Sequence, residues 1–285
     1  MDRLQQAIEK AREQRAAALR GNPTAGPLAE DGTRPQPAAA PEELPRGGPW
    51  AELTPVDLSA RQLRNNRLMA SKAGTTAVPF DLLRTRMLHQ ARQNNWRNIG
   101  IVSPTAECGK TTAAANLAFA FSRQPEVRMV LMDFDLRRPR LAAMMGQKVE
   151  HSMQDVLLGQ VSFAEHARRL GDNVCIGFNR GAAESPSELL QSTRTEKKLD
   201  EITEQFAPDL MLFDLPPMMS TDDNFGFLGR VDAALLIVAA EHSTTEHIDV
   251  ALRQLGELTT VMGIVLNKCR HVGGAYGYDS KYYNS

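Results

Sequence analysis

Short apolar runs alternate with segments of helical spacing from residue 98 onward. The runs with strand character cover residues 98–103, 128–133, 173–178, 209–214, 232–239 and 261–267. Segments with helical spacing lie between them at residues 110–123, 188–206 and 244–258. Short strands that are apolar on both faces and separated by helices are typical of a parallel sheet. The pattern therefore predicts an α/β fold in which a mostly parallel sheet is flanked by helices on both faces.

The first fifty residues have a different composition. Residues 1–20 are rich in alanine and mixed charges, which predicts a helical tail, either solvated or docked on another surface. Residues 21–50 are rich in Pro, Gly and Ala, and seven of the sixteen prolines lie between Pro23 and Pro49. Such a segment buries too little apolar surface to offset its ordering entropy. We therefore expect a disordered linker at 21–50, a folded domain at 51–270 and a flexible tail at 271–285.

Composition and charge narrow the class of protein. The chain has 285 residues, a net charge of −1 and 42% hydrophobic residues, so it can bury a core without disulfides or metals. Near-neutral charge argues against a nucleic-acid partner bound through bulk charge, although it allows a local basic patch. The three cysteines lack CxxC spacing, which excludes a zinc ribbon. The charged first residues and the lack of a long apolar run predict a cytoplasmic soluble protein, or one that reaches a membrane only through a partner.

A turn typical of phosphate binding follows the first predicted strand. Residues 103–112 read SPTAECGKTT and lead into a helix, with Gly109, Lys110 and Thr111 as the end of a P-loop. Glycine lets the backbone approach a phosphate, lysine can reach the β and γ phosphates, and the threonine hydroxyl can bind Mg²⁺. The pattern is incomplete, because Pro104 stands at the first glycine position and Glu107 stands where another glycine is common. A chance GKT turn is the alternative.

Two later strands end in acidic motifs. Residues 130–137 end in DxDxR with Asp133 and Asp135, and residues 211–217 end in DxPP with Asp214. Ligands of open α/β sheets bind at the carboxyl ends of the strands, and Mg·ATP needs carboxylates opposite the phosphate cradle. Aspartates that cap strand-end turns are the structural alternative. The three motifs in this order favour a site for ATP and Mg²⁺.

Together these motifs closely resemble the bacterial tyrosine kinase (BY-kinase) family of capsule and exopolysaccharide systems. The resemblance runs from about residue 80 to the C-terminus and implies a P-loop NTPase fold and ATP-dependent protein-tyrosine kinase activity. The implied catalytic residues are Lys110, Asp133, Asp135 and Asp214, and the implied Mg²⁺ ligands are Thr111, Asp133 and Asp214. The implied nucleotide-binding residues are Glu107, Cys108, Gly109, Lys110, Thr111, Thr112 and Asn267. A plain strand-end turn explains Asn267 almost as well as adenine recognition.

All four tyrosines lie within the last ten residues of the chain, at Tyr276, Tyr278, Tyr282 and Tyr283. They stand in the sequence GGAYGYDSKYYNS, whose glycines and serine do not predict a packed strand or helix. A frayed tail, or an aromatic tail that docks on a partner, is the structural interpretation. The BY-kinase resemblance implies instead a cluster of phosphoacceptors. Each phosphate adds about −1.5 to −2 charge to such a tail.

Two departures from the family bear on partners. The ExxRxxR interface helix of the family is reduced here to Val78, Asp81 and Arg84, so a ring-shaped oligomer built on that motif is in doubt. Many relatives are fused to a two-span membrane domain, whereas this chain shows only a tail and a linker. The resemblance therefore implies a stand-alone form that needs a membrane polysaccharide co-polymerase as activator, with self-association for transfer between molecules.

Two other functions compete with the tyrosine autokinase. A partition- or Min-type ATPase shares the fold, but its second signature lysine is replaced here by Thr105, five residues before Lys110. Such an ATPase also has no reason to gather every tyrosine at one end. A nucleotide-binding scaffold with decayed kinase activity is the third hypothesis, and Glu107 is its main support. Fold alone does not decide between them.

Overall fold

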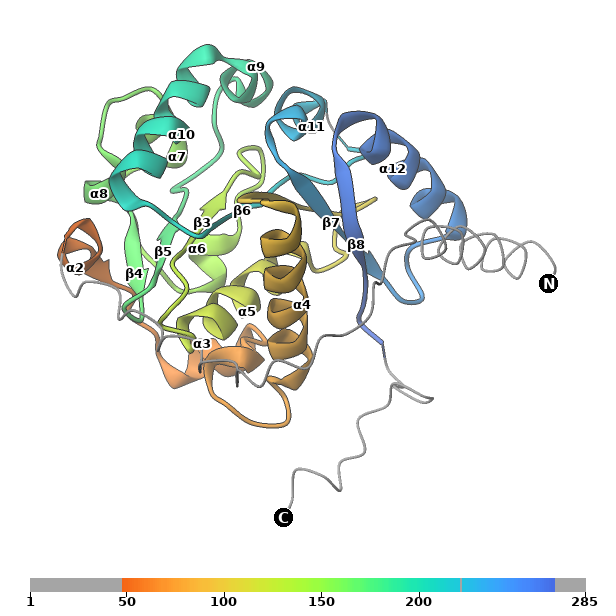
Figure 1. Cartoon of the computed structure of the whole chain (residues 1–285), viewed down its shortest axis with the longest axis horizontal. Helices are drawn as coiled ribbons and strands as arrows, with labels where there is room; N and C mark the ends of the chain where they lie inside the picture. The colour runs from red at the N-terminus through yellow and green to blue at the C-terminus, as the bar shows by residue number, and fades with distance from the viewer. Residues whose placement is uncertain (1–47, 221, 270–285) are drawn as a thin grey trace, which may run out of the picture. The chain divides into compact units, whose positions relative to one another are not determined.

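Eight strands form one sheet in the computed structural model, which describes residues 48–220 and 222–269 (Figure 1). Their order across the sheet is β1-β4-β5-β3-β6-β2-β7-β8, and every neighbouring pair is parallel except β4 and β5. The strands are β1 (Thr54–Pro55), β2 (Asn98–Val102), β3 (Met129–Asp133), β4 (Arg168–Leu170), β5 (Val174–Gly177), β6 (Leu210–Asp214), β7 (Ala233–Ala239) and β8 (Thr260–Asn267). The predicted mostly parallel α/β sheet is therefore confirmed.

The six predicted strands correspond to β2, β3, β5, β6, β7 and β8. The sequence pattern missed β1 and β4, which are only two and three residues long. Neither carries an apolar run, since β4 begins with Arg168 and Arg169. Their pairing with each other and with β5 is a tertiary effect that local periodicity does not encode.

Helices cover the sheet on both faces. The helices before β3 are α2 (Pro49–Glu52), α3 (Ala60–Asn65), the 3-10 helix η1 (Met69–Ser71), α4 (Val78–Asn94) and α5 (Lys110–Ser122). The later ones are α6 (Leu141–Met144), α7 (Met153–Leu157), α8 (Phe163–His166), α9 (Pro186–Gln191), α10 (Thr193–Phe206), α11 (Asp223–Phe227), the 3-10 helix η2 (Leu228–Arg230) and α12 (Thr245–Leu258). None of these described helices is long and apolar enough to cross a membrane.

The single helix predicted at 188–206 is two helices, α9 and α10. Ser192 separates them, because its backbone is extended (ψ 146°) and its side chain accepts a hydrogen bond from the Thr195 amide. Serine is favoured at this N-cap position, where it satisfies an otherwise unpaired amide of the new helix. The prediction was wrong at this point because the apolar spacing continues across the cap.

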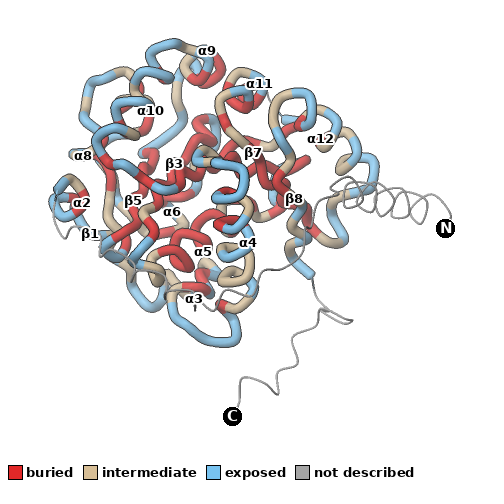
Figure 2. Tube along the Cα trace, viewed as in Figure 1, coloured by how far each residue is buried: buried red, intermediate tan, exposed pale blue. Residues whose placement is uncertain are grey.

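The core has two layers, one on each side of the sheet (Figure 2). Alternate residues of β6 show the division: Leu210 and Leu212 face the layer that contains α4, α5 and α6. Met211 and Phe213 face the layer that contains α2, α7 to α12 and η2. Successive strand side chains point to opposite faces, so strands buried on both sides read as continuous apolar runs.

The folded part begins before residue 51. Trp50, which we assigned to the linker, lies in α2 and is only 3% exposed. Its indole Nε1 donates to the carbonyl oxygen of Phe206 at 2.8 Å, and the two rings meet edge to face at 5.6 Å. An edge-to-face aromatic pair adds about 0.5–1.5 kcal/mol beyond area burial. The rest of the linker, residues 21–47, and the N-terminal tail lie outside the described residues.

The arginine that remains from the interface motif is used within the chain. Arg84 donates to the carbonyl oxygen of Ala120 at 2.7 Å and lies 3.5 Å from the Asp81 carboxylate. Arg123 of the neighbouring α5 end is ion-paired to the same Asp81. These contacts hold α4 against α5. Arg84 therefore stabilises the fold of a single chain, whether or not it also contacts a second molecule.

Candidate active site

The P-loop connects β2 to α5 and is held by the last strand. Gly109 is the N-cap of α5 and has a left-handed backbone (φ 89°), which favours glycine. A Cβ atom at Gly109 would also collide with the side-chain amide of Asn267. That amide donates from Nδ2 to the carbonyl oxygen of Cys108 at 2.9 Å. Asn267 therefore holds the loop, and adenine recognition by this residue stays a prediction.

The acidic residues come together because their strands are neighbours. Asp133 and Asp214 end β3 and β6 and are directly paired in register, and β6 also pairs with β2, which leads into the P-loop. Lys110 Nζ lies 3.1 Å from Asp135 Oδ2 and 3.2 Å from Asp214 Oδ1. The four predicted catalytic residues are thus assembled in one place.

The position of Lys110 differs from our expectation. We expected its charge to serve a phosphate rather than the interior, but its side chain is only 7% exposed and bridges two carboxylates. Burial alone lowers the pKa of this ammonium group, and the carboxylates of Asp214 and Asp135 outweigh burial and raise it. Lys110 is therefore charged, and the carboxylates hold that charge at the base of the P-loop.

The two strand-end aspartates have perturbed protonation equilibria. Asp133 has a pKa well above its ordinary value, first because of desolvation and second because Asp214 is near. The pKa of Asp214 is also raised by burial, although Lys110 and a hydrogen bond from the Thr111 hydroxyl oppose the shift. Buried carboxyl groups with raised pKa values lack the solvation that water gives to an ionised carboxylate. A bound cation can supply that stabilisation, so such a site favours cation binding.

The donor set suits Mg²⁺. Oδ1 of Asp133 and Oδ2 of Asp214 are buried and accept no hydrogen bond from the described residues. An orphaned carboxylate oxygen in the interior is costly, and hard cations prefer oxygen ligands of this type. The hydroxyl of Thr111 is bonded to Asp214, so the third predicted ligand lies beside them. Asp133, Asp214 and Thr111 therefore fit the metal that the P-loop implies.

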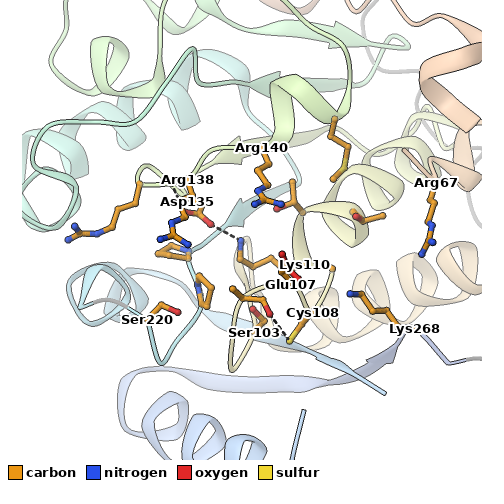
Figure 3. A pocket seen from close by; sticks show the side chains of 18 residues that line it. Arg67, Ser103, Glu107, Cys108, Lys110, Asp135, Arg138, Arg140, Ser220 and Lys268 are labelled. Carbon is orange, nitrogen blue, oxygen red and sulfur yellow. Dashed lines mark hydrogen bonds and ion pairs between the residues drawn. The ribbon is translucent and has the colours of Figure 1, made fainter. Parts of the chain in front are cut away.

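A cavity of about 720 Å³ lies above these carboxylates (Figure 3). It is lined by Arg67, Ser103, Ala106, Glu107, Cys108, Gly109, Lys110, Thr111, Thr112, Asp135, Arg137, Arg138, Arg140, Met144, Pro216, Pro217, Ser220 and Lys268. The predicted nucleotide-binding residues 107–112 are all among them. Asn267 is not, and it acts from behind the loop. Asp135 lines the cavity, whereas Asp133 and Asp214 lie beneath it with no exposed surface.

Sequence reasoning missed most of the basic lining. Arg67, Arg140 and Lys268 come from three separate segments, and no motif pointed to the first two. Arg138, which follows the DxDxR motif, also lines the cavity. The near-neutral overall charge hid this local concentration of cations.

Arg137, the last residue of DxDxR, connects three segments beside the cavity. Its Nε donates to Asp223 Oδ2 at 2.7 Å, and its Nη2 donates to Asp223 Oδ1 at 3.0 Å and to Ser187 Oγ at 3.1 Å. Ser187 lies in α9, and it also donates to Asp223 of α11. A bidentate pair of this kind fixes geometry as well as adding energy. Arg137 therefore ties the loop after β3 to α9 and α11.

Glu107 occupies a strained position in the P-loop. Its backbone is left-handed (φ 63°), a conformation that costs a non-glycine residue about 1–2 kcal/mol. This explains in physical terms why a glycine is common there. The side chain is exposed and lines the cavity.

The predicted phosphoacceptors Tyr276, Tyr278, Tyr282 and Tyr283 lie outside the described residues.

Of the histidines that are described, His166 is buried, with Nε2 2.8 Å from the carbonyl oxygen of Phe178. Within residues 48–220 and 222–269, no cluster of three His, Cys, Asp or Glu side chains forms a metal site of protein ligands alone.

Known proteins resemble the chain over most of its length. Residues 99–274 match the family model of the CobQ/CobB/MinD/ParA nucleotide binding domain. Tyrosine-protein kinase EpsB of Ralstonia solanacearum is 31% identical over 245 residues, which cover 80% of this chain and 31% of that protein. Tyrosine-protein kinase etk of Escherichia coli K12 is 28% identical over 196 residues, which cover 67% of this chain and 26% of that protein. The chain thus spans less than a third of the length of either relative.

A solved structure extends the likeness to the fold. The kinase domain of the Escherichia coli tyrosine kinase ETK matches with a TM-score of 0.65 at 21% identity, covering 80% of this chain and 93% of that domain. The family match, the relatives and the assembled P-loop site agree. The chain belongs to the family of the CobQ/CobB/MinD/ParA nucleotide binding domain and, within it, to the bacterial tyrosine kinases.

Proposed function

We propose that the chain is an ATP-dependent protein-tyrosine autokinase that phosphorylates its own C-terminal tyrosine cluster. One observation carries the proposal: the P-loop lysine and three carboxylates meet at a basic cavity, in a chain whose four tyrosines all lie within its last ten residues. The relatives named as tyrosine kinases support the same activity. By the family resemblance, the phosphorylation regulates the synthesis or export of an exopolysaccharide or capsule.

The site residues have different roles in the proposed reaction. The amides of residues 108–112 and the ammonium group of Lys110 bind the phosphates of ATP. Asp133, Asp214 and Thr111 hold Mg²⁺, which neutralises phosphate charge. Asp135 is the carboxylate that lines the cavity, so it takes the phenol proton. The phenol oxygen forms a bond to the γ-phosphorus as the bond to the ADP oxygen breaks.

Transfer runs mainly between molecules. Asn267 touches the P-loop, so the chain leaves β8 beside its own site. Nine residues separate Asn267 from Tyr276, which gives a reach of about 30 Å at most. A phenol of the same chain is within that reach but must double back to lie in line with the γ-phosphate. A tail from a second molecule approaches the open cavity directly.

A mixing experiment tests activity and route together. Full-length Lys110→Met protein serves as acceptor, and a Lys110-intact chain ending at Gly274 serves as enzyme, with labelled Mg·ATP. Phosphotyrosine on two or more of Tyr276, Tyr278, Tyr282 and Tyr283 of the acceptor supports transfer between molecules. If the acceptor stays unlabelled while wild-type protein labels itself, the route is within one molecule. If wild-type protein with a membrane co-polymerase present acquires no phosphotyrosine, the kinase proposal fails.

The nucleotide-binding scaffold is the second candidate, and the left-handed, acidic Glu107 in the P-loop favours it. It predicts ATP binding with neither phosphotyrosine nor turnover. The Min-type switch predicts phosphate release without phosphotyrosine. Thr105, in place of its signature lysine, instead contacts Cys108 Sγ at 3.6 Å within the loop. Phosphate release and phosphotyrosine measured on one sample separate the three functions.

A membrane activator belongs to the proposal as well. The resemblance to kinases of capsule and exopolysaccharide systems supports a membrane polysaccharide co-polymerase as the partner that recruits the protein to the inner face of the plasma membrane. Co-purification with such a protein, and a rise in autophosphorylation when it is added, are the expected results. Equal rates with and without the co-polymerase would remove the activator from the proposal.

A further inference from the structure

Four cations line the cavity without an ion pair to any carboxylate of residues 48–220 and 222–269. Within the described part of the chain, Lys110 is paired with Asp135 and Asp214, and Arg137 is paired with Asp223. The remaining basic side chains make no ion pair with any described residue; they are Arg67, Arg138, Arg140 and Lys268. Mg·ATP brings its own cation, so one bound nucleotide leaves positive charge to spare. The surplus indicates a second anionic group in the same cavity.

Arg67 is held at the cavity by a buried side chain. Its backbone is left-handed (φ 54°), a conformation that an arginine rarely adopts. Nδ2 of Asn116, which is 0% exposed in α5, donates to the Arg67 carbonyl oxygen at 3.0 Å. Oδ1 of the same Asn116 accepts from the Ala70 amide at 2.8 Å. Arg67 and the residues up to Ala70 are therefore fixed to α5, the helix that begins with Lys110. Strain of this kind is typical of functional positions.

Arg140 is brought to the same side of the cavity. It is the N-cap of α6, and the next residue, Leu141, donates its amide to Asp133 Oδ2 at 3.2 Å. The far end of α6 is bound to the Arg67 segment, because Asn66 Nδ2 donates to the Met144 carbonyl oxygen at 2.6 Å. Figure 3 shows Arg67 on the side of the cavity away from Asp135, with Arg140 between them. Neither arginine belongs to the P-loop wall.

We propose that Arg67 and Arg140 form an anion clamp that binds a phosphate already present on one tyrosine of the acceptor tail while another tyrosine is phosphorylated. This inference rests on the proposed kinase function. Arginine suits the task, because its planar donors bind phosphate oxygens in pairs. The unmodified tail offers little for two arginines, since Asp279 is its only acid and Lys281 cancels that charge. The first phosphate supplies the missing negative charge.

The spacing of the tyrosines allows one tail to reach both places. Tyr278 and Tyr282 are four residues apart, which is about 14 Å at full extension. A phosphate on Tyr282 can thus lie in the clamp while Tyr278 meets the γ-phosphate near Asp135. The clamp makes later phosphorylations faster than the first, so a tail that has received one phosphate is converted to a multiply phosphorylated tail.

Peptide binding tests the clamp directly. The enzyme is the full-length chain with its four tyrosines changed to Phe, so that it offers no acceptor of its own. Labelled peptides of residues 271–285 are compared without phosphate, with phosphotyrosine at 282, and with Asp279→Asn. We expect the phosphopeptide to bind about tenfold more tightly than the unmodified peptide. We expect Arg67→Gln and Arg140→Gln each to remove most of that preference, and Arg64→Gln, on the same segment but outside the cavity, to retain it.

Four outcomes overturn the clamp. The first is equal affinity for both peptides. The second is an unchanged preference in the double Arg67→Gln, Arg140→Gln variant. The third is a parallel loss of Mg·ATP affinity in these variants, which assigns the arginines to the nucleotide. If Asp279→Asn abolishes binding of both peptides, the anion is the carboxylate and the phosphate clamp is wrong. The kinase function is tested separately, by whether the chain with its four tyrosines changed to Phe and Arg67 and Arg140 intact phosphorylates the unmodified peptide. The two tests are independent, because the binding measurements need no catalysis.

Discussion

The ammonium nitrogen of Lys110, at the start of α5, lies 3.2 Å from Oδ1 of Asp214, at the end of β6. This ion pair joins the P-loop to the DxPP strand. Lys110 thus stabilises the fold, besides its proposed role in phosphate binding. A buried carboxylate that loses such a partner is left uncompensated, which costs about 3–5 kcal/mol unless the carboxyl group takes up a proton.

Lys110→Met should therefore do two things. It should abolish nucleotide-dependent phosphorylation, and it should lower the free energy of unfolding by about 3 kcal/mol or more at pH 8. The loss should shrink as the pH falls, because burial raises the pKa values of Asp133 and Asp214 and these carboxyl groups then take up protons. Denaturant unfolding at pH 8 and at a lower pH measures it. A variant as stable as wild type at pH 8 would show that the ion pairs contribute nothing to stability.

Asp133→Asn should stabilise the protein while it removes Mg²⁺-dependent activity. The pKa of Asp133 is raised because the folded protein disfavours the ionised carboxylate. The contribution of this group to the free energy of unfolding is therefore fully present below the pKa of about 3.9 in the unfolded chain. That contribution is lost as the pH rises through the higher pKa of the folded state. Asparagine can keep the hydrogen bond from Leu141 without the charge. We expect the free energy of unfolding of Asp133→Asn to exceed that of the wild type by about 1–3 kcal/mol at pH 7.5, and this difference should become smaller as the pH falls.

Thermal unfolding with and without Mg²⁺ checks this trade between stability and function. Wild-type protein should gain stability on addition of Mg·ATP, and Asp133→Asn should gain little. Asp57→Asn, at an exposed site, is the matched control and should behave as wild type. A loss of stability in Asp133→Asn at neutral pH would mean that the ionised carboxylate is well compensated.

Glu107→Gly should improve both folding and nucleotide binding. Glycine relieves the left-handed strain at φ 63°, which we expect to add about 1 kcal/mol of stability. Removing a negative charge near the phosphates should tighten ATP binding by about 1 kcal/mol, or roughly fivefold. Glu107→Gln separates the two effects, since it removes the charge and keeps the strain. Weaker ATP binding by either variant would show that Glu107 has acquired a role in the site.

His166 should make stability fall in mild acid. Burial lowers the pKa of its imidazole to about 4, whereas an exposed histidine titrates near 6.5. As the pH falls, the unfolded chain therefore takes up the proton before the folded protein does. The stabilisation that the neutral imidazole provides above about pH 6.5 is lost as the pH falls through 4, and the loss in free energy of unfolding is at most about 3 kcal/mol. His166→Gln keeps a donor for the Phe178 carbonyl oxygen. Its stability should depend less on pH in this window, and parallel pH profiles would exclude the histidine as the cause.

Sequence motifs could predict the carboxylates and the P-loop of the site, but not the arginines at positions 67 and 140 that also line the cavity. Asp133, Asp214 and the P-loop stand at strand ends, and the parallel order of the sheet converts those positions into one edge. The Arg67 position depends on a hydrogen bond to Asn116 and a left-handed turn, neither of which has a local signature. The ion pairs of Lys110 were missed for a different reason, because P-loop motifs describe the bound state.

The same contrast holds for the fold. Strands with apolar runs were predicted to within about one residue, since burial on both faces leaves a continuous pattern. The boundary at Trp50 was wrong, because a single buried aromatic after a proline-rich segment carries no periodicity. Its position follows from the pocket that α10 offers to the ring, and such long-range packing overrides local composition.

The Arg137–Asp223 pair should show strong coupling in a double-mutant cycle. Asp223 is 1% exposed, so Arg137→Gln leaves a buried carboxylate with the Ser187 hydroxyl as one remaining partner. Arg137→Gln and Asp223→Asn should each destabilise the protein, and the double variant should lose less than the sum, with a coupling of about 1–3 kcal/mol. The neighbouring Arg138 has no ion pair with a described residue, so Arg138→Gln should change stability by less than about 0.5 kcal/mol.

The cycle also distinguishes structure from positioning. If Arg137 positions the loop after β3, the single variants should reduce kcat for tail phosphorylation while the ATP affinity of the folded protein stays within about twofold. Asp223→Glu should restore part of the rate, because it retains the charge that orients the guanidinium group. Coupling near zero, or a purely proportional loss of folded protein and rate, would reduce the Arg137 network to an ordinary surface ion pair.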